Sequence, residues 1–290
     1  MSITRTGGFG IGFRKGWSNW QKDAVGLAKW AGDNDFACID VGGDVEQVRQ
    51  FQQAGAVVVS ADLAQSWKDL ICTDTAKRDA ALAVNRQHIQ ACAALGVKVF
   101  FLVMLPADPA AKRADNFKLM VEAFAGLMPT LEQTGTQLAI EGWPGPGALC
   151  CTPETYRAFF KEVPSKANGI NYDPSHLVRL GVDYLRFLDE FADRVVHVHG
   201  KDTELLSERL YELGNEQPAT FAAGIGFGGN GWRYTLPGHG VIRWGAICQR
   251  LKQAGYKGKV CIELEDANFN GTEEGEKAGL IFARRFLEGC

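Results

Sequence analysis

Short apolar runs alternate with longer amphipathic stretches along the whole of this 290-residue chain. The apolar runs predict strands, listed here by residue number: 8–13, 36–41, 56–61, 97–104, 137–141, 169–173, 194–199 and 258–263. The stretches between them predict helices, at 45–54, 78–95, 116–133, 153–161, 182–191, 244–254 and 272–286. Strands that alternate with helices indicate a parallel sheet, and eight such units point to an α/β fold, a single (β/α)8 TIM barrel.

Turn and capping residues support these boundaries. Gly55, Gly96 and Gly255 each follow a helical pattern and precede a strand, as helix-terminating glycines do. Thr152 and Pro153 predict a helix start, with a capping hydroxyl before a proline at the first helical position.

The alternative architecture is an open doubly wound sheet. That fold would normally place a glycine-rich phosphate loop between its first strand and helix, whereas GGFGIGF lies before or within the first strand. Nothing in the composition suggests a linker or a repeat that would divide the chain. We therefore expect one TIM-barrel domain over residues 1–290.

A long interval, residues 201–237, follows the seventh predicted strand. It contains a short helix-like piece, TELLSERLYEL, and then the glycine-rich GIGFGGNGWRYTLPGHG. Loops after barrel strands lie at the catalytic mouth, and loops of this length in a compact domain are usually functional. We expect a lid over the mouth, with a decorative insertion as the alternative.

Composition narrows the classes of partner. The formal net charge of −3 argues against a nucleic-acid partner, which normally requires a basic excess. No apolar run has the length of a membrane span, and the N-terminus lacks the apolar core of a signal peptide. The eight cysteines form no C-x-x-C pair, so we expect reduced, partly buried thiols and a cytoplasmic protein.

Four strand-like segments in the second half each end in a side chain that can bind metal. They are QLAIEGWP with Glu141, GINYDPSH with Asp173, RVVHVHGKD with His199 and KVCIELED with Glu263. The carboxyl ends of parallel barrel strands meet at one face, so these side chains should converge. Three carboxylates and one imidazole predict one divalent ion, Mn²⁺ above all, with Mg²⁺, Co²⁺ or Zn²⁺ as alternatives.

The alternation of side chains along a strand refines these choices. His197 and His199 face the same side, and His199 is the better ligand because it lies nearer the carboxyl end. We expect His197 to be a hydrogen-bonded residue of an inner layer. Glu263 and Glu265 also share a face; Glu263 ends the apolar run and is the predicted ligand, with Glu265 as the alternative.

Neighbouring polar residues are candidates for contact with substrate. His176 lies three residues beyond Asp173 and is expected to contact substrate, to donate to a ligand or to cap the next helix. Asn171 would face inward one layer below Asp173 and could orient the ligands. Lys201 and Asp202 could bind substrate hydroxyls or help to expel one.

The motifs IEGWP, NYDPSH, HVHGKD, PGHGVIRW and IELED, in this order, resemble the xylose-isomerase-like barrel superfamily of sugar phosphate isomerases and epimerases. That group includes ketose 3-epimerases, inosose dehydratases and, more distantly, the endonuclease IV type of DNA-repair enzyme. The resemblance covers nearly the whole chain. It implies that one divalent metal is bound by the four strand-end residues Glu141, Asp173, His199 and Glu263.

The resemblance also implies roles for single residues. Glu141 and Glu263 would be the acid/base pair, and His176 would contact substrate. An arginine between strands 7 and 8 commonly contacts substrate in this family, and Arg233 is the nearest match. The family often has Glu at the end of strand 2, where this chain has Asp40, so the residue that meets the far end of the substrate is unassigned.

These inferences predict an isomerase or epimerase that removes a proton next to the carbonyl of a sugar or polyol through a metal-stabilised enediolate. A lyase or dehydratase on a keto-sugar or inosose is the alternative, with Lys201 or His239 as general acid. A nuclease fits poorly because the chain has only five histidines, and a non-catalytic sugar-binding barrel is the remaining alternative. The Trp143 ring could form the base of a sugar-binding site. We expect a small-molecule partner and neither nucleic acid nor membrane, and leave homo-oligomerisation open.

Overall fold

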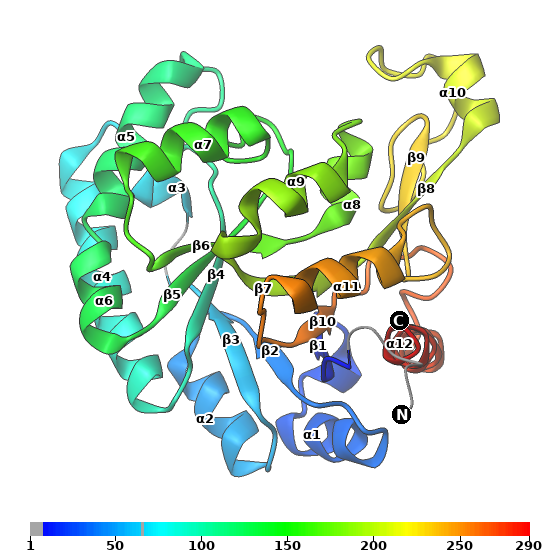
Figure 1. Ribbon diagram of the computed structural model, residues 1–290, viewed down its shortest axis with the longest axis horizontal. Coiled ribbons are helices and arrows are strands. Elements are labelled where there is room, and N and C mark those ends of the chain that lie inside the picture. Colours follow the sequence, from blue (N-terminus) through cyan, green and yellow to red (C-terminus); the bar gives the residue numbers. More distant parts are fainter. Residues whose placement is uncertain (1–7, 65–66) are drawn as a thin grey trace.

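A closed barrel of eight parallel strands forms the centre of the molecule in the computed structural model, which describes residues 8–64 and 67–290 (Figure 1). The barrel strands are β1 (Ile11–Arg14), β2 (Ile39–Val41), β3 (Val58–Asp62), β4 (Val99–Val103), β5 (Gln137–Glu141), β6 (Asn168–Tyr172), β7 (Val195–Gly200) and β10 (Val260–Ile262). Pairing of β1 with both β2 and β10 closes the sheet, which confirms the predicted (β/α)8 barrel.

Helices cover the outside of this barrel (Figure 1). They are α1 (Ala24–Asp33), α2 (Val45–Gln53), α3 (Trp67–Leu70), α4 (Thr75–Ala94), α5 (Arg113–Ala125), α6 (Met128–Thr134), α7 (Pro153–Glu162), α8 (Pro174–Arg179), α9 (Tyr184–Phe191), α11 (Trp244–Gln253) and α12 (Glu273–Glu288), with short 3₁₀ turns at Asn19–Gln21 and Ala192–Arg194.

The predicted elements lie where the pattern places them, with three corrections. The single helix predicted at 116–133 is wrong: Pro129 cannot continue a helix, so the chain breaks into α5 and α6. Helix α1, which Asp23 caps, was not predicted, since AVGLAKWAGD carries two glycines and little amphipathic contrast. The short helices α3 and α8 were missed as well, because each is under two turns long.

The interval after β7 is more regular than predicted. Instead of a loop with one helical piece, it contains an antiparallel ribbon of β8 (Asp202–Leu205) and β9 (Trp232–Thr235), with α10 (Ser207–Leu213) between the strands. The ribbon and α10 project away from the barrel in Figure 1, in yellow and yellow-green. Residues 201–237 therefore form a structured extension beside the mouth.

Two buried carboxylates fasten the base of this ribbon. Asp202 accepts hydrogen bonds from the backbone amides of Thr203, Gly238 and Ile242. Asp266, just beyond β10, accepts from Thr235 Oγ1 at 2.5 Å and from Arg233 Nη1 at 3.0 Å. The ribbon is thus tied to the strand ends on both of its edges.

The two faces of the barrel strands differ in side-chain size. The outward face is bulky and apolar, with fully buried residues such as Phe13, Phe100, Leu138 and Ile140 packed beneath the helices. The inward face carries small residues below the mouth, among them Gly12, Cys38, Ser60, Ala139 and Gly169. Barrel interiors are usually filled by Val, Ile and Leu, so these small residues leave room for polar side chains inside.

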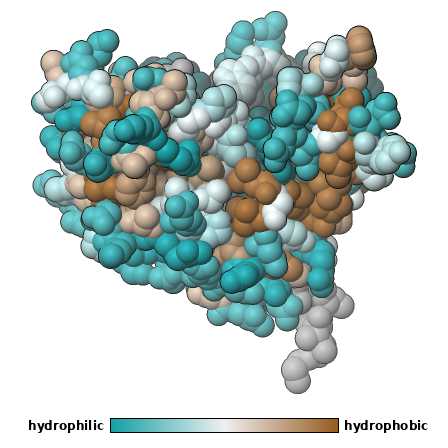
Figure 2. All heavy atoms as spheres, turned by 90° about the horizontal axis from the view of Figure 1, so that it is seen from above, coloured by the Kyte–Doolittle hydropathy of each residue, from teal (hydrophilic) through white to brown (hydrophobic). Residues whose placement is uncertain are grey.

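The surface seen in Figure 2 is mostly hydrophilic, with apolar side chains gathered in a few patches. All eight cysteines are free thiols, and every one except Cys290 is buried. Within residues 8–64 and 67–290, no helix is long and apolar enough to cross a membrane.

Glu276 on α12 ties the outer helix layer to the segment after β1. Its carboxylate is buried and accepts hydrogen bonds from Ser18 Oγ and Trp20 Nε1, both at 2.6 Å, and from Gln21 Nε2 at 3.0 Å. Burial alone would raise the pKa of Glu276, but these donors outweigh burial and lower it.

We expect Glu276→Gln to lower the free energy of unfolding by about 2 kcal/mol at pH 7, because hydrogen bonds to a charged group are lost or weakened. A lowered folded-state pKa adds stability above the unfolded-state value of about 4.3, and that stability is lost as the pH falls through the folded value. The difference between wild type and variant, read from thermal midpoints by circular dichroism, should therefore shrink below about pH 4. Glu273→Gln, on an exposed pair of the same helix, is the control; an equal effect in both variants would contradict this role.

Candidate active site

The strand-end residues predicted as metal ligands converge at one end of the barrel. Glu141 ends β5, Asp173 directly follows β6, His199 lies in β7 and Glu263 directly follows β10. His199 Nδ1 is 3.0 Å from Glu141 Oε2 and 3.5 Å from Glu263 Oε2. Glu141, Asp173, Glu263 and His176 each offer a ligand atom within 4.8 Å of the others, whereas His199 falls in a second such group with Asp40 and His197.

Asp173 owes its position to the start of α8. One carboxylate oxygen, Oδ1, caps the helix by accepting from the Ser175 amide at 2.9 Å and from its hydroxyl at 2.6 Å. Pro174 occupies the first helical position, where its missing N–H is not needed. The cap holds the carboxylate rigidly and leaves Oδ2 directed into the site.

Three buried atoms of the predicted ligands form no hydrogen bond among the described residues, although charged groups lie near them: Asp173 Oδ2 and both ring nitrogens of His199. Buried polar atoms are normally hydrogen-bonded, so atoms without a hydrogen bond beside a cluster of carboxylates indicate a missing partner. Carboxylate oxygens with one imidazole are ligands that Mn²⁺ and Mg²⁺ accept. The residues present therefore fit a divalent cation, and Glu141, Asp173, His199 and Glu263 could hold it.

A buried lysine supplies positive charge to the same carboxylates. Lys201 Nζ lies 2.5 Å from Glu263 Oε2, 3.0 Å from Glu265 Oε2 and 3.2 Å from Asp173 Oδ2, and the residue is only 1% exposed. Both glutamates that the sequence offered as fourth ligand thus contact Lys201. Glu263 is the one that also approaches His199, as the predicted choice requires.

Arg14, at the end of β1, provides a second cation. Its guanidinium forms a two-pronged pair with Asp62, at 2.8 Å for each contact, and lies 3.4 Å from Glu263 Oε1. The sequence reasoning missed Arg14. The available signal was its position two residues after Gly12, on the inward face at a strand end.

These charges set the ionisation of the site. Burial alone would raise the pKa of Glu141 and Glu263, but His199 beside Glu141 and Lys201 beside Glu263 hold both values well below their usual range. Burial would lower the pKa of His199, yet Glu141 and Glu263 outweigh it and raise that pKa to about 10. Without a metal, the site at neutral pH therefore contains ionised carboxylates and a protonated His199.

His176 connects the site to the ribbon. Its Nε2 lies 3.1 Å from Glu141 Oε1, and its Nδ1 is hydrogen-bonded to the Tyr234 hydroxyl at 2.7 Å. Arg179 also donates to that hydroxyl, at 3.1 Å. Tyr234 comes from β9 and was not predicted, because only the ribbon geometry brings it to the barrel mouth.

Other predicted substrate residues are engaged elsewhere in this structure. Asp202 is taken up by backbone amides at the base of the ribbon, and burial raises its pKa to about 6 although those amides oppose the rise. Arg233 pairs with Glu204 at 2.6 Å and with Asp266 at 3.0 Å. The Trp143 ring folds back over Gly145, within its own loop.

A cavity of about 110 Å³ opens beside these carboxylates. Glu263 and Glu265 form one wall, and Arg14, Lys15 and Trp17 after β1 form another. The remaining lining is Gly16, Gln21, Phe227, Leu264, Asn270, Glu276 and Leu280. Trp17, at the rim, is 81% exposed and presents an aromatic face to an incoming molecule.

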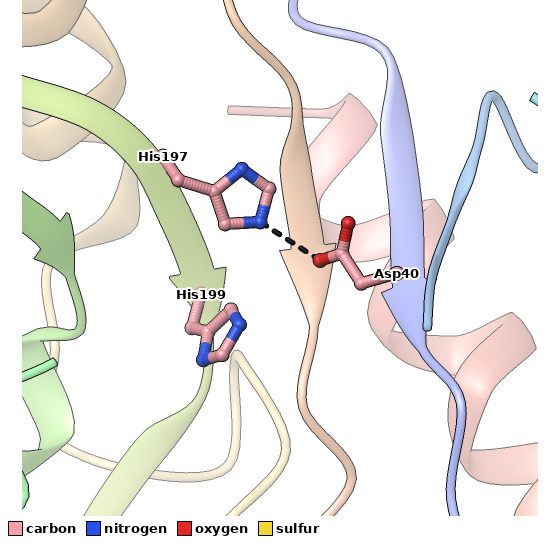
Figure 3. A group of neighbouring side chains, drawn as sticks. All are labelled: Asp40, His197 and His199. Atoms are coloured by element: carbon pink, nitrogen blue, oxygen red, sulfur yellow. Dashed lines mark hydrogen bonds and ion pairs between the residues drawn. The ribbon is translucent and has the colours of Figure 1, made fainter. Parts of the chain in front are cut away.

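An inner layer of polar residues supports the site from below. Asn171 donates a hydrogen bond to Glu141, as its inward position predicted. His197 is hydrogen-bonded to Asp40 at 2.8 Å, which confirms its prediction as an inner-layer residue (Figure 3). Asp40 is therefore the hydrogen-bond partner of His197 and lies below the mouth of the barrel.

Comparison with known proteins agrees with the architecture. Residues 31–286 match the family described as the xylose isomerase-like TIM barrel. The inosose dehydratase of Geobacillus thermodenitrificans is 27% identical over 154 residues, which are 52% of this chain and 48% of that protein. The chain thus matches only about half the length of this relative.

Solved structures resemble the whole chain at lower identity. The apo 3-keto-D-glucoside 4-epimerase from E. coli superposes with a TM-score of 0.69 at 16% identity, over 96% of this chain and 99% of that one. A D-psicose 3-epimerase gives a TM-score of 0.68 at 16% identity, over 97% and 99%. At such identities the likeness shows the fold alone.

We expect Lys201→Met to destabilise the metal-free protein by about 3–5 kcal/mol, because buried carboxylates would lose their ammonium partner. Mn²⁺ should restore much of the loss by supplying positive charge to the same oxygens. Thermal midpoints with EDTA and with Mn²⁺ test both statements. Lys166→Met removes an exposed pair and is the control; an unchanged midpoint for Lys201→Met in EDTA would contradict the charge role.

Proposed function

Because the chain belongs to the xylose isomerase-like TIM-barrel family, we propose that it is a divalent-metal-dependent sugar isomerase or epimerase that removes a proton next to a carbonyl. One observation carries this proposal. Two ionised carboxylates, the buried Glu141 and the largely buried Glu263, flank the same imidazole at the barrel mouth, beside atoms of Asp173 and His199 that form no hydrogen bond.

The cation would be held by Glu141, Asp173, His199 and Glu263, with Mn²⁺ as the best match to this donor set. When bound, it would draw electron density from the carbonyl and hydroxyl oxygens of the substrate and so acidify the hydrogen on the hydroxyl-bearing carbon next to the carbonyl. The protein's own part is to supply the base, to orient the sugar and to keep water out.

Glu141 and Glu263 are available to accept a proton because their lowered pKa values keep them ionised at neutral pH. Glu141 ends β5 and Glu263 directly follows β10, with β6 and β7 between these strands in the barrel, so the two residues reach the site from different directions. One carboxylate on each side of a reacting carbon would invert it, which is epimerisation. A single carboxylate that carries the proton between neighbouring carbons would give isomerisation.

Hydrogen bonds hold each base in place. Asn171 and His176 contact the two oxygens of Glu141, and Lys201 and Arg14 contact those of Glu263. The substrate would be a small sugar or polyol that enters the cavity between Trp17 and the carboxylates. Positioned acid/base groups contribute about 10²- to 10⁴-fold in rate.

A dehydratase is the second candidate, and Lys201 favours it. Its neighbours Asp173, Glu263 and Glu265 outweigh burial and hold the pKa of Lys201 well above its usual value, so it carries a proton that it could give to a departing hydroxyl. The inosose dehydratase relative, although matched over half its length, is consistent with this reaction. Both candidates share the first step, removal of a proton by a glutamate.

Metal binding should release a proton. His199 is protonated in the metal-free site, with a pKa of about 10, whereas a metal ligand must be neutral. Below that pKa, we expect Mn²⁺ to bind with loss of about one proton and to gain affinity as the pH rises. Calorimetry in buffers of different ionisation enthalpy measures this proton count. His199→Asn should abolish the release, and binding to wild type without proton loss would remove His199 from the ligand set.

Substitution of either base should stop exchange with solvent. We expect Glu141→Gln and Glu263→Gln each to reduce deuterium incorporation from D₂O into a bound ketose by at least about 10²-fold, because an amide cannot accept the proton. Mass spectrometry of recovered ketose measures the exchange, and circular dichroism checks the fold. Glu154→Gln, on α7 outside the site, is the control. Near-normal exchange in either variant would exclude that residue as a base.

The product separates the two candidates in the same experiment. An isomerase or epimerase returns a sugar of unchanged mass apart from deuterium, whereas a dehydratase returns one lighter by a molecule of water. Lys201→Met should slow proton exchange in either case, because Lys201 holds Glu263, but only in a dehydratase should it leave exchange without loss of water.

A further inference from the structure

Asp40 and His197 form a buried polar pair inside the barrel. Asp40 comes from β2 and His197 from β7, and in the closed sheet β1 and β10 lie between these two strands. Their side chains meet across the interior, with His197 Nε2 2.8 Å from Asp40 Oδ2, and the two residues are 0% and 2% exposed (Figure 3). The two side chains can meet because the neighbouring residues are small. At Gly12 of β1, for example, there is no room for a side chain, since an added Cβ would lie 2.3 Å from Cys38 Sγ.

The charge of Asp40 is retained despite complete burial. Burial alone would raise its pKa, but His197 and, to a smaller degree, His199 outweigh burial and lower it. Only one of its oxygens is hydrogen-bonded; Oδ1 has no partner in the part of the chain that the structure describes. A buried carboxylate of this kind exerts a strong field on nearby polar groups.

His199 lies between this pair and the carboxylates above. Its Nδ1 faces Glu141 and Glu263, at 3.0 and 3.5 Å. One ring nitrogen lies on the side of Asp40 and His197, with ligand atoms of the three residues within 4.8 Å of one another (Figure 3). Phe101 stacks on the ring at a centroid distance of 5.2 Å, which restricts its rotation. The two nitrogens of His199 therefore have different surroundings.

We propose that Asp40 is a positioning residue that keeps the proton of neutral His199 on Nε2, so that Nδ1 is free to bind the cation. The negative charge of Asp40 favours an N–H dipole directed towards it and disfavours a bare lone pair there. This inference rests on the proposed metal-dependent function. On this proposal Asp40, at the end of strand 2, orients a metal ligand and does not contact substrate.

The length of the side chain agrees with this task. The Asp40 side chain reaches only as far as His197, in the layer below the mouth, and it is not among the residues that line the cavity. Carboxylates that orient metal-binding histidines typically change metal affinity about 10- to 100-fold when they are removed. Asn has the same shape and removes only the charge, so Asp40→Asn isolates the effect of the field.

The test uses metal affinity and the tautomer of His199. The Mn²⁺ dissociation constant is measured on chelator-treated wild type, Asp40→Asn and Ser60→Ala. Ser60 is equally buried on β3 and forms no hydrogen bond among the described residues, so its variant controls for any change of the barrel interior. We expect Asp40→Asn to weaken binding about 10- to 100-fold and Ser60→Ala to leave it within about twofold.

The tautomer is read from ¹⁵N-labelled histidine in protein loaded with diamagnetic Zn²⁺. Wild type should show a proton on His199 Nε2 and metal on Nδ1, and His199→Asn assigns the signal. This measurement needs no Asp40 variant, so it can overturn the proposal even where Asp40→Asn does not fold. Zinc on Nε2 in wild type would overturn the proposal.

The remaining outcomes are separable. If wild type binds one ion and folded Asp40→Asn binds it equally well, the positioning role is overturned while the metal-dependent function stands. If wild type binds two ions and Asp40→Asn loses one, Asp40 is itself a ligand and the proposal is overturned. If wild type binds none, both the positioning role and the proposed function fail.

Discussion

The structure depends on the confinement of several negative charges in a largely buried volume. Glu141, Asp173 and Glu263 reach the same point from three strands, and a carboxylate without a partner is costly to bury. The surrounding residues are arranged to meet this constraint. Lys201, Arg14 and His199 each lie within 3.5 Å of one of these carboxylates, and the helix start after β6 satisfies one oxygen of Asp173.

The same constraint explains the unusual barrel interior. Polar and charged side chains can fill the mouth only because the strands below it contribute Gly12, Ala139 and Gly169. The stabilising apolar contacts lie on the outer face of the strands, where Phe13, Phe100 and Leu138 pack beneath the helices. The contacts that stabilise the fold and the side chains of the candidate site thus lie on opposite faces of the same strands.

Most of the fold and the centre of the site could be predicted from the sequence, because both follow from local periodicity. The strand-end acids were recognisable because each closes an apolar run, and alternation correctly assigned His197 to an inner layer. The ribbon of β8 and β9 could not be foreseen. Each strand has four residues, too few to show alternation, and TELLSERL resembles a helix.

Residues whose role depends on tertiary contacts were accordingly the ones missed. Tyr234 reaches His176 only through the ribbon, and Arg14 finds Asp62 only across the barrel wall. Asp202 follows Lys201 directly in the sequence, yet the loop amides that surround it come from residues 238 and 242. Sequence alone gives the chemical type of such a residue and leaves its partner open.

The attachment of the ribbon has a mechanical consequence. Its first strand begins one residue after Lys201, and its second strand carries Tyr234, over whose ring the Lys201 ammonium lies at 4.6 Å. Asp266, which anchors the second strand, lies three residues beyond Glu263. The ribbon and the charged cluster therefore share a backbone, so a displacement of the ribbon would move the residues that neutralise the carboxylates. In kinetic terms, motion of the ribbon and neutralisation of the carboxylates are coupled.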